Sequence, residues 1–143
     1  MVKTKIDIFY QNFNGIRSKL SEIRREQLTT DDDIICGTES KIQEDVNDAE
    51  ICPTGSQFSI QRRDRNLSST GLQGGGGCMA LTRVQMFVKR MTQFEVLETN
   101  EDLWLQIALE GGYKLLLCII YLRPNSSIVE LREFTDSVTA VKN

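Results

Sequence analysis

Four polar residues stand where predicted strands end, and their chemistry suits phosphate and metal binding. Asn12, with Asn14 close behind it, follows one apolar alternating segment, Glu39 follows a second, and Tyr121 closes a third. Functional residues gather at strand ends and in the loops that follow them. A carboxylate such as Glu39 is a hard oxygen ligand for Mg²⁺, which often takes one or two protein carboxylates with phosphate and water. The alternative is an ordinary exposed glutamate.

A basic segment and a glycine run lie between Glu39 and Tyr121. Arg62, Arg63 and Arg65 could contact DNA phosphates or form surface ion pairs, and Asp64 could pair with one of them. Residues 74–77 are all glycine, but no Gly-Lys-Ser/Thr and no helix follow, so the run is no P-loop. We expect it to permit a close backbone approach beside a strand.

The elements that would position these residues alternate between strands and helices. Period-two alternation or continuous apolar runs predict strands over residues 5–11, 33–38, 58–63, 78–82, 102–110 and 114–121, the last as a central strand buried on both faces. Gly111-Gly112 indicates a hairpin turn. Apolar stripes predict helices over residues 16–28 and from Ser127 to the C-terminus. The first strand, helix and second strand suggest a βαβ crossover, so the fold class is α/β or α+β.

Composition limits the classes of function. The 143 residues carry a formal net charge of −3, so any DNA contact must be local or assisted by metal. The absence of histidine excludes a His-containing zinc site. Four cysteines without a C-x-x-C spacing indicate plain thiols in a reducing compartment. We find no signal-peptide pattern and no apolar run approaching 18 residues, and we therefore expect an intracellular protein that is neither secreted nor inserted in a membrane.

Four segments in order carry a resemblance to a known family. They are IDIFYQNFNGIRSKL (residues 6–20), DIICGTES (33–40), QRRDR with GGGGCMAL (61–65 and 74–81) and CIIYLRPNSS (118–127). Together they resemble the endonuclease/exonuclease/phosphatase domain of non-LTR retrotransposons. This domain is of the exonuclease III-like and AP-endonuclease-like type. The Arg-Arg-Asp-Arg and glycine combination points to the retrotransposon branch.

The resemblance implies a fold and a set of roles. Residues 1–143 would form the N-terminal portion of a single domain, a partial deoxyribonuclease I-like α/β sandwich with one mixed sheet and flanking helices. Asn12 and Tyr121 would act on the phosphate as catalytic residues, Glu39 would bind Mg²⁺ or Mn²⁺, and Asn14 would stand on the metal side. Arg62, Arg63 and Arg65 would contact DNA phosphates, and DNA would be the partner, with the nucleus as the expected location.

The sequence also departs from the family. The family's Asp-x-Asn and Ser-Asp-His motifs are missing, and no histidine is present to act on the attacking water. We therefore expect a truncated Mg²⁺-dependent DNA endonuclease that is inactive as this fragment. A non-catalytic relic or domesticated nucleic-acid-binding module is the alternative, and a phosphoesterase for small esters is a third. An apolar sheet face left exposed would receive the missing half of the domain or mediate self-association.

Overall fold

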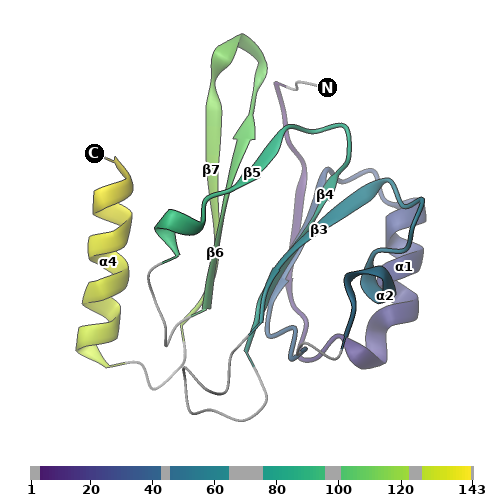
Figure 1. The fold of residues 1–143 in the computed structure, drawn as a ribbon, viewed down its shortest axis with the longest axis horizontal. Helices are drawn as coiled ribbons and strands as arrows, with labels where there is room; N and C mark the ends of the chain where they lie inside the picture. The colour runs from purple at the N-terminus through teal and green to yellow at the C-terminus, as the bar shows by residue number, and fades with distance from the viewer. Residues whose placement is uncertain (1–3, 43–45, 65–75, 96–100, 123–126, 143) are drawn as a thin grey trace.

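A computed structural model describes residues 4–42, 46–64, 76–95, 101–122 and 127–142 (Figure 1). The strands are β1 (Ile8–Asn12), β2 (Ile34–Thr38), β3 (Phe58–Arg63), β4 (Cys78–Arg83), β5 (Val88–Arg90), β6 (Glu101–Ala108) and β7 (Lys114–Tyr121). The α-helices are α1 (Leu20–Thr29), α2 (Asp48–Ile51) and α4 (Ile128–Lys142). Short 3₁₀ turns span Arg17–Lys19, Thr92–Phe94 and Glu110–Gly112.

The first sheet has the strand order β1-β2-β4-β3 and is mixed. β1 and β2 are parallel neighbours joined through α1, which confirms the predicted βαβ crossover, while β4 runs antiparallel to β2 and β3. Gly37 in β2 lets the Phe13 ring lie against the strand, because a Cβ there would meet Phe13 Cε2 at 2.6 Å and the Gln11 carbonyl oxygen at 2.0 Å. This glycine therefore fixes how the segment after β1 folds back over the sheet.

A second, antiparallel sheet has the strand order β5-β6-β7. The two sheets pack face to face, because buried residues of β2 and β4 form one cluster with residues of β6 and β7: Ile34, Cys36, Cys78, Ala80, Leu103, Leu105, Ile107 and Ile119. The α/β class is thus confirmed, and the chain has two sheets where we expected one. The sequence marks each strand but not the sheet to which it belongs.

The prediction that β7 is a central strand buried on both faces is wrong. β7 lies at the edge of its sheet and pairs with β6 alone among the described strands. Ile119 points into the core between the sheets, whereas Leu116 on the other side of the strand is 39% exposed. A continuous apolar run therefore marks a strand here without marking a central one.

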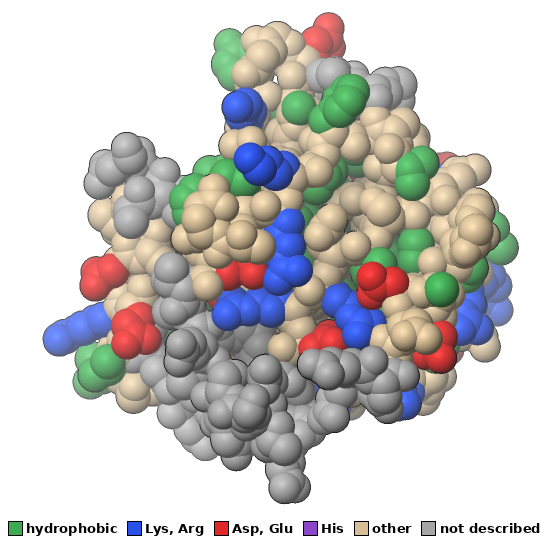
Figure 2. Space-filling view, viewed as in Figure 1, with side chains coloured by type: hydrophobic (Ala, Val, Ile, Leu, Met, Phe, Trp, Pro, Cys, Tyr) green, Lys and Arg blue, Asp and Glu red, His purple; other side chains and the backbone are tan. Residues whose placement is uncertain are grey.

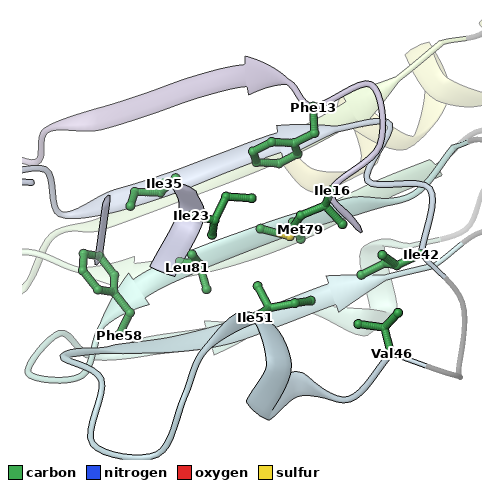
Figure 3. Close-up of a cluster of buried hydrophobic side chains, with 10 residues drawn as sticks. All are labelled: Phe13, Ile16, Ile23, Ile35, Ile42, Val46, Ile51, Phe58, Met79 and Leu81. Carbon is green, nitrogen blue, oxygen red and sulfur yellow. The ribbon is translucent and has the colours of Figure 1, made fainter. Parts of the chain in front are cut away.

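The outer face of the first sheet carries a second core (Figure 3). Side chains from β2, β3 and β4 meet side chains from α1, α2 and the loops after β1 and β2: Phe13, Ile16, Ile23, Ile35, Ile42, Val46, Ile51, Phe58, Met79 and Leu81. Both faces of this first sheet are therefore covered. Exposed apolar side chains lie along its edge strand β1, at Ile8, Phe9 and Tyr10, and on the second sheet at Leu116 of β7. The expected exposed apolar sheet face stays a prediction.

No helix within the described part of the chain is long and apolar enough to cross a membrane. The four cysteines are all free, as the sequence predicted, and Cys36 and Cys78 are buried. Burial raises the pKa of the Cys36 thiol to about 11. These side chains therefore behave as small apolar core residues.

Candidate functional site

The carboxyl ends of β1 and β2 meet at one end of the first sheet. Asn12 is in register with Thr38, the residue before Glu39. Beyond the strands the two loops stay joined, since the Gly15 amide donates to the Glu39 carbonyl at 2.8 Å and the Ile16 amide donates to the Ser40 carbonyl at 3.0 Å. The structure therefore brings Asn12, Asn14 and Glu39 together, as the sequence indicated.

Three non-glycine residues at this junction have left-handed backbone conformations. Asn14, Glu39 and Lys41 have φ angles of 46°, 53° and 54°. L-residues other than glycine adopt this region at a cost of about 1–3 kcal/mol each, and such strain concentrates at functional sites. The Asn12 side-chain oxygen accepts a hydrogen bond from the Asn14 amide at 3.0 Å, which stabilises the turn. All three strained residues belong to the predicted metal and phosphate end of the sheet.

The end of the glycine run, Gly76 and Gly77, lies against the loop that follows Glu39. The Ser40 amide donates to the Gly77 carbonyl at 3.3 Å, and the Lys41 amide donates to the Gly76 carbonyl at 2.8 Å. A Cβ on Gly77 would lie 2.4 Å from the Ser40 hydroxyl oxygen, and Gly77 has a φ of 91°. The expected close backbone approach is confirmed, and it is the loop after Glu39 that approaches.

Tyr121 is the last residue of β7 and is partly buried, in register with Glu101. Figure 1 shows β7 running from the hairpin toward the end of the sandwich at which β1 also ends. The structure thus places Tyr121 at the same end of the molecule as Asn12 and Glu39. Its contact with a phosphate stays a prediction.

The two described arginines of the basic segment are engaged by carboxylates. Arg62 lies 3.0 Å from Asp64 and 3.4 Å from Asp48, and its side chain is 15% exposed. Arg63 pairs with Asp102 of β6 and also donates to the Asp102 carbonyl at 2.9 Å. Figure 2 shows Lys and Arg side chains interleaved with Asp and Glu side chains across the middle of the visible face. Arg65 lies outside the described residues.

Asp102 is a buried carboxylate that the sequence pattern did not single out. It has no exposed surface, and it accepts hydrogen bonds from Arg63 and, at 2.9 Å, from the Trp104 indole nitrogen. Desolvation raises the pKa of Asp102, while the bond from Trp104 and the charge of Arg63 oppose that rise. Since Arg63 lies on β3 and Asp102 on β6, the pair joins the two sheets at the end where the candidate site lies.

The donor groups at this end suit a hard divalent cation. Glu39 supplies a carboxylate, the hard oxygen ligand that Mg²⁺ prefers, whereas the Asn12 and Asn14 amide oxygens already accept from the Asn14 amide and the Lys41 ammonium. Within the described ranges, no three acidic, cysteine or histidine side chains gather in one place. A single carboxylate, completed by water and phosphate, is a ligand set that Mg²⁺ or Mn²⁺ can use.

Similar solved structures define the class of fold. The AP endonuclease LMAP from Leishmania major aligns over 94% of this chain with a TM-score of 0.70 and 13% identity. The 3′ phosphatase NExo from Neisseria, bound to a product DNA hairpin, aligns over 96% with a TM-score of 0.56 and 12% identity. The catalytic domain of APE2 from Xenopus laevis aligns over 92% with a TM-score of 0.55 and 14% identity. No family model and no curated protein matches the sequence.

The chain therefore has the deoxyribonuclease I-like α/β fold of AP endonuclease and exonuclease III-like domains. It covers 47%, 50% and 49% of the three matched chains, about half of each. The expected fold class is confirmed. At 12–14% identity the likeness concerns the fold, and the function must be argued from the site.

Proposed function

We propose that this chain, residues 1–143, is the N-terminal portion of a Mg²⁺- or Mn²⁺-dependent DNA endonuclease domain of the non-LTR retrotransposon type. The observation that carries the proposal is the junction of β1 and β2, where Asn12, Asn14 and Glu39 meet on a strained backbone. The fold shared with AP endonucleases supports it, and so do the motifs around Arg62 and Tyr121. Nuclear DNA would be the substrate.

Each site residue has a role in phosphodiester hydrolysis under this proposal. The Glu39 carboxylate would hold the divalent ion, which would supply a Lewis acid for the phosphate. The Asn12 amide nitrogen is left to donate to a phosphate oxygen, because the Asn12 oxygen already accepts from the Asn14 backbone. The Tyr121 hydroxyl donates to the phosphate from the end of β7. Together these groups orient the phosphate and stabilise its charge.

We further propose that the chain by itself does not turn over substrate. It contains no histidine, and in the family a histidine acts on the attacking water. The test is nicking of supercoiled plasmid in Mg²⁺, with Glu39→Gln as the control. We expect no nicking above the Glu39→Gln background. Nicking by the wild-type chain that Glu39→Gln abolishes would overturn the proposed inactivity and support the site.

The absence of histidine also favours a second candidate, a non-catalytic nucleic-acid-binding module. In that case the site end would bind DNA without cleaving it, and Glu39 would hold a divalent ion that would supply positive charge for the phosphate. Electrophoretic mobility shifts at low salt, with and without Mg²⁺, test for binding. Failure to bind any duplex or single strand at low salt would eliminate both the endonuclease and the binding-module proposals.

A further inference from the structure

One side of the sandwich is open, because both sheets end there in an edge strand. β1 pairs with β2 alone, and β7 pairs with β6 alone, among the described strands. β7 packs across β2, while β6 packs across β4 and β3, so the edges of β1 and β7 lie on the same side of the sandwich. In Figure 1 the sheets stand side by side, with α4 outside the second sheet and α1 and α2 outside the first. The described helices therefore lie on the outer faces, and this side is defined by the two strand edges.

β1 carries three consecutive apolar side chains on this open side, and all three are exposed. Ile8 is in register with Ile34, which faces the core between the sheets, yet Ile8 is 40% exposed. Tyr10 shares that face of the strand and is 55% exposed. Phe9 faces the outer core and is 45% exposed. An edge strand with exposed apolar side chains on both faces is a site at which another strand can pair.

The main chain of Ile8 also points to the open side. The Phe13 amide donates to the Thr38 carbonyl at 2.9 Å, and the Asp7 carbonyl accepts from the Ile34 amide at 3.2 Å. The residues of a strand turn their main-chain groups alternately to one side and to the other. Because the odd-numbered residues of β1 bond to β2, the amide and carbonyl of Ile8 point away from β2. They are therefore placed to bond to a further strand.

This edge is complementary to a second copy of itself. A two-fold axis perpendicular to the sheets sets β1 antiparallel to its copy, and the residues whose main chains point outward then stand opposite one another. With the axis at Ile8, the two copies of Ile8 face each other, and Ile6 of each copy faces Tyr10 of the other. All three apolar side chains of the inter-sheet face then pair with apolar side chains. An axis displaced by one residue in either direction would set one of them against a polar residue, Thr4 or Asn12.

We propose that two copies of this chain associate through the open side, with β1 of one copy antiparallel to β1 of the other. The same axis brings the two β7 edges toward each other, so both sheets continue across the dimer. The inference does not rest on the proposed endonuclease function. The chain covers 47–50% of the three matched chains, and two copies together therefore have about the length of one such chain.

The size of the open side is sufficient for a dimer interface. β7 has 8 residues, and at about 3.4 Å per residue it is about 27 Å long. The sheets lie about 10 Å apart, and the side chains outside each sheet add about 5 Å, so the side is about 20 Å deep. Each copy thus contributes about 540 Å², and the total of about 1,100 Å² meets the requirement of about 1,000 Å² for a specific interface.

Sedimentation equilibrium over about 1–100 µM tests the association, since interfaces of modest area often bind in the micromolar range. We expect the mass to rise from 16.3 kDa to twice that value. Ile8→Lys should raise the dimer Kd at least about tenfold, because both copies lose an apolar contact and two ammonium groups then face each other. Leu28→Lys is the matched control, because Leu28 is an exposed apolar residue on α1, away from the strand edges. It should keep the wild-type Kd.

Disulfide trapping tests the register separately. In the proposed pairing the two Ile8 Cα atoms lie about 5.5 Å apart, within reach of a disulfide, so Ile8→Cys should cross-link under mild oxidation. Phe9→Cys is the control, because Phe9 is at least as exposed as Ile8. Its two copies are offset by about 6.8 Å along the strands and about 4.8 Å between them, about 8 Å in all, which is too far for a disulfide. The wild-type chain, with four free cysteines, gives the background.

Each outcome supports or overturns the dimer. A wild-type chain that stays at 16.3 kDa at the highest concentration overturns it. A Kd that Ile8→Lys leaves unchanged, or that Leu28→Lys raises equally, overturns the assignment of the surface. Masses above that of a dimer contradict the closed two-fold arrangement. If Ile8→Lys does not fold, the cross-links decide, and equal cross-linking of Ile8→Cys and Phe9→Cys overturns the register. None of these measurements involves DNA, so failure of the dimer leaves the proposed function standing.

Discussion

Breaking the pair formed by Arg63 and Asp102 should destabilise the fold strongly, because the pair joins β3 to β6 through a fully buried carboxylate. Arg63→Ala leaves Asp102 with the Trp104 indole as its remaining described side-chain donor. Removing one partner of a buried ion pair costs about 3–5 kcal/mol. The Arg63 side chain is 23% exposed, so water reaches the pair, and we expect the lower end, about 3 kcal/mol.

Asp102→Asn tests the same pair from the other side. Asparagine keeps an oxygen that can accept from Trp104, but it removes the negative charge that Arg63 meets. A hydrogen bond to a charged group contributes about 1.5–3 kcal/mol, but desolvation raises the pKa of Asp102, so its charge costs free energy in the folded state, and we expect a loss at the low end, about 1.5 kcal/mol. In the double variant no unpaired charge stays buried. Its loss should therefore be smaller than the sum of the two single losses by about 2 kcal/mol.

Urea unfolding followed by tryptophan fluorescence measures these free energies. Trp104 is the single tryptophan of the chain and lies directly against Asp102, so its emission reports on this region. Arg132→Ala, at an exposed position on α4, is the control and should change stability by less than about 0.5 kcal/mol. Single losses that add to the double loss within about 0.5 kcal/mol would refute the coupling.

Three further predictions follow from the same structure. Gly77→Ala should cost about 1–3 kcal/mol more than Gly55→Ala in urea unfolding, because both have positive φ but only Gly77 would clash, with Ser40; equal costs would show that the loop moves freely. Desolvation holds the pKa of Asp102 above its ordinary value of 3.8, so this group makes the free energy of unfolding fall as pH rises just above 3.8. Asp102→Asn should remove that slope, and an unchanged slope would contradict the assignment. The Cys36 thiol, buried and with a pKa of about 11, should react with thiol reagents at pH 8 only on unfolding, and rapid labelling at Cys36 itself in the native chain would contradict its burial.

The strands were predictable from the sequence where apolar residues recur with a clear period. β3 and β7 begin and end at the predicted residues, 58–63 and 114–121. The four-residue helix α2 was missed, because so short a segment shows no helical period. The second sheet was missed for a different reason. Strand pairing depends on contacts between segments far apart in the chain, and the alternation within one strand does not determine which strand pairs with it.

The site was predictable in part. Asn12 and Glu39 each follow an apolar run, and two parallel neighbours bring their carboxyl ends together. The strained backbone at Glu39 and Lys41 left no signal, because neither residue type favours a positive φ. Asp102 was missed because an acidic residue at the start of a strand ordinarily faces water. Its signal was the tryptophan two positions on, whose indole nitrogen needs an acceptor when buried.

The strained junction requires support from the rest of the fold, and the structure shows where that support comes from. Three left-handed residues together cost on the order of 3–9 kcal/mol at about 1–3 kcal/mol each. Main-chain hydrogen bonds tie Glu39 to Gly15 and Lys41 to Gly76, and Phe13 and Ile16, fully buried, anchor the loop after β1 in the core. The positions of Asn14, Glu39 and Lys41 are therefore set by packing before any phosphate or metal binds. A site built in this way loses little conformational entropy on binding, which is the physical advantage of retaining the strain.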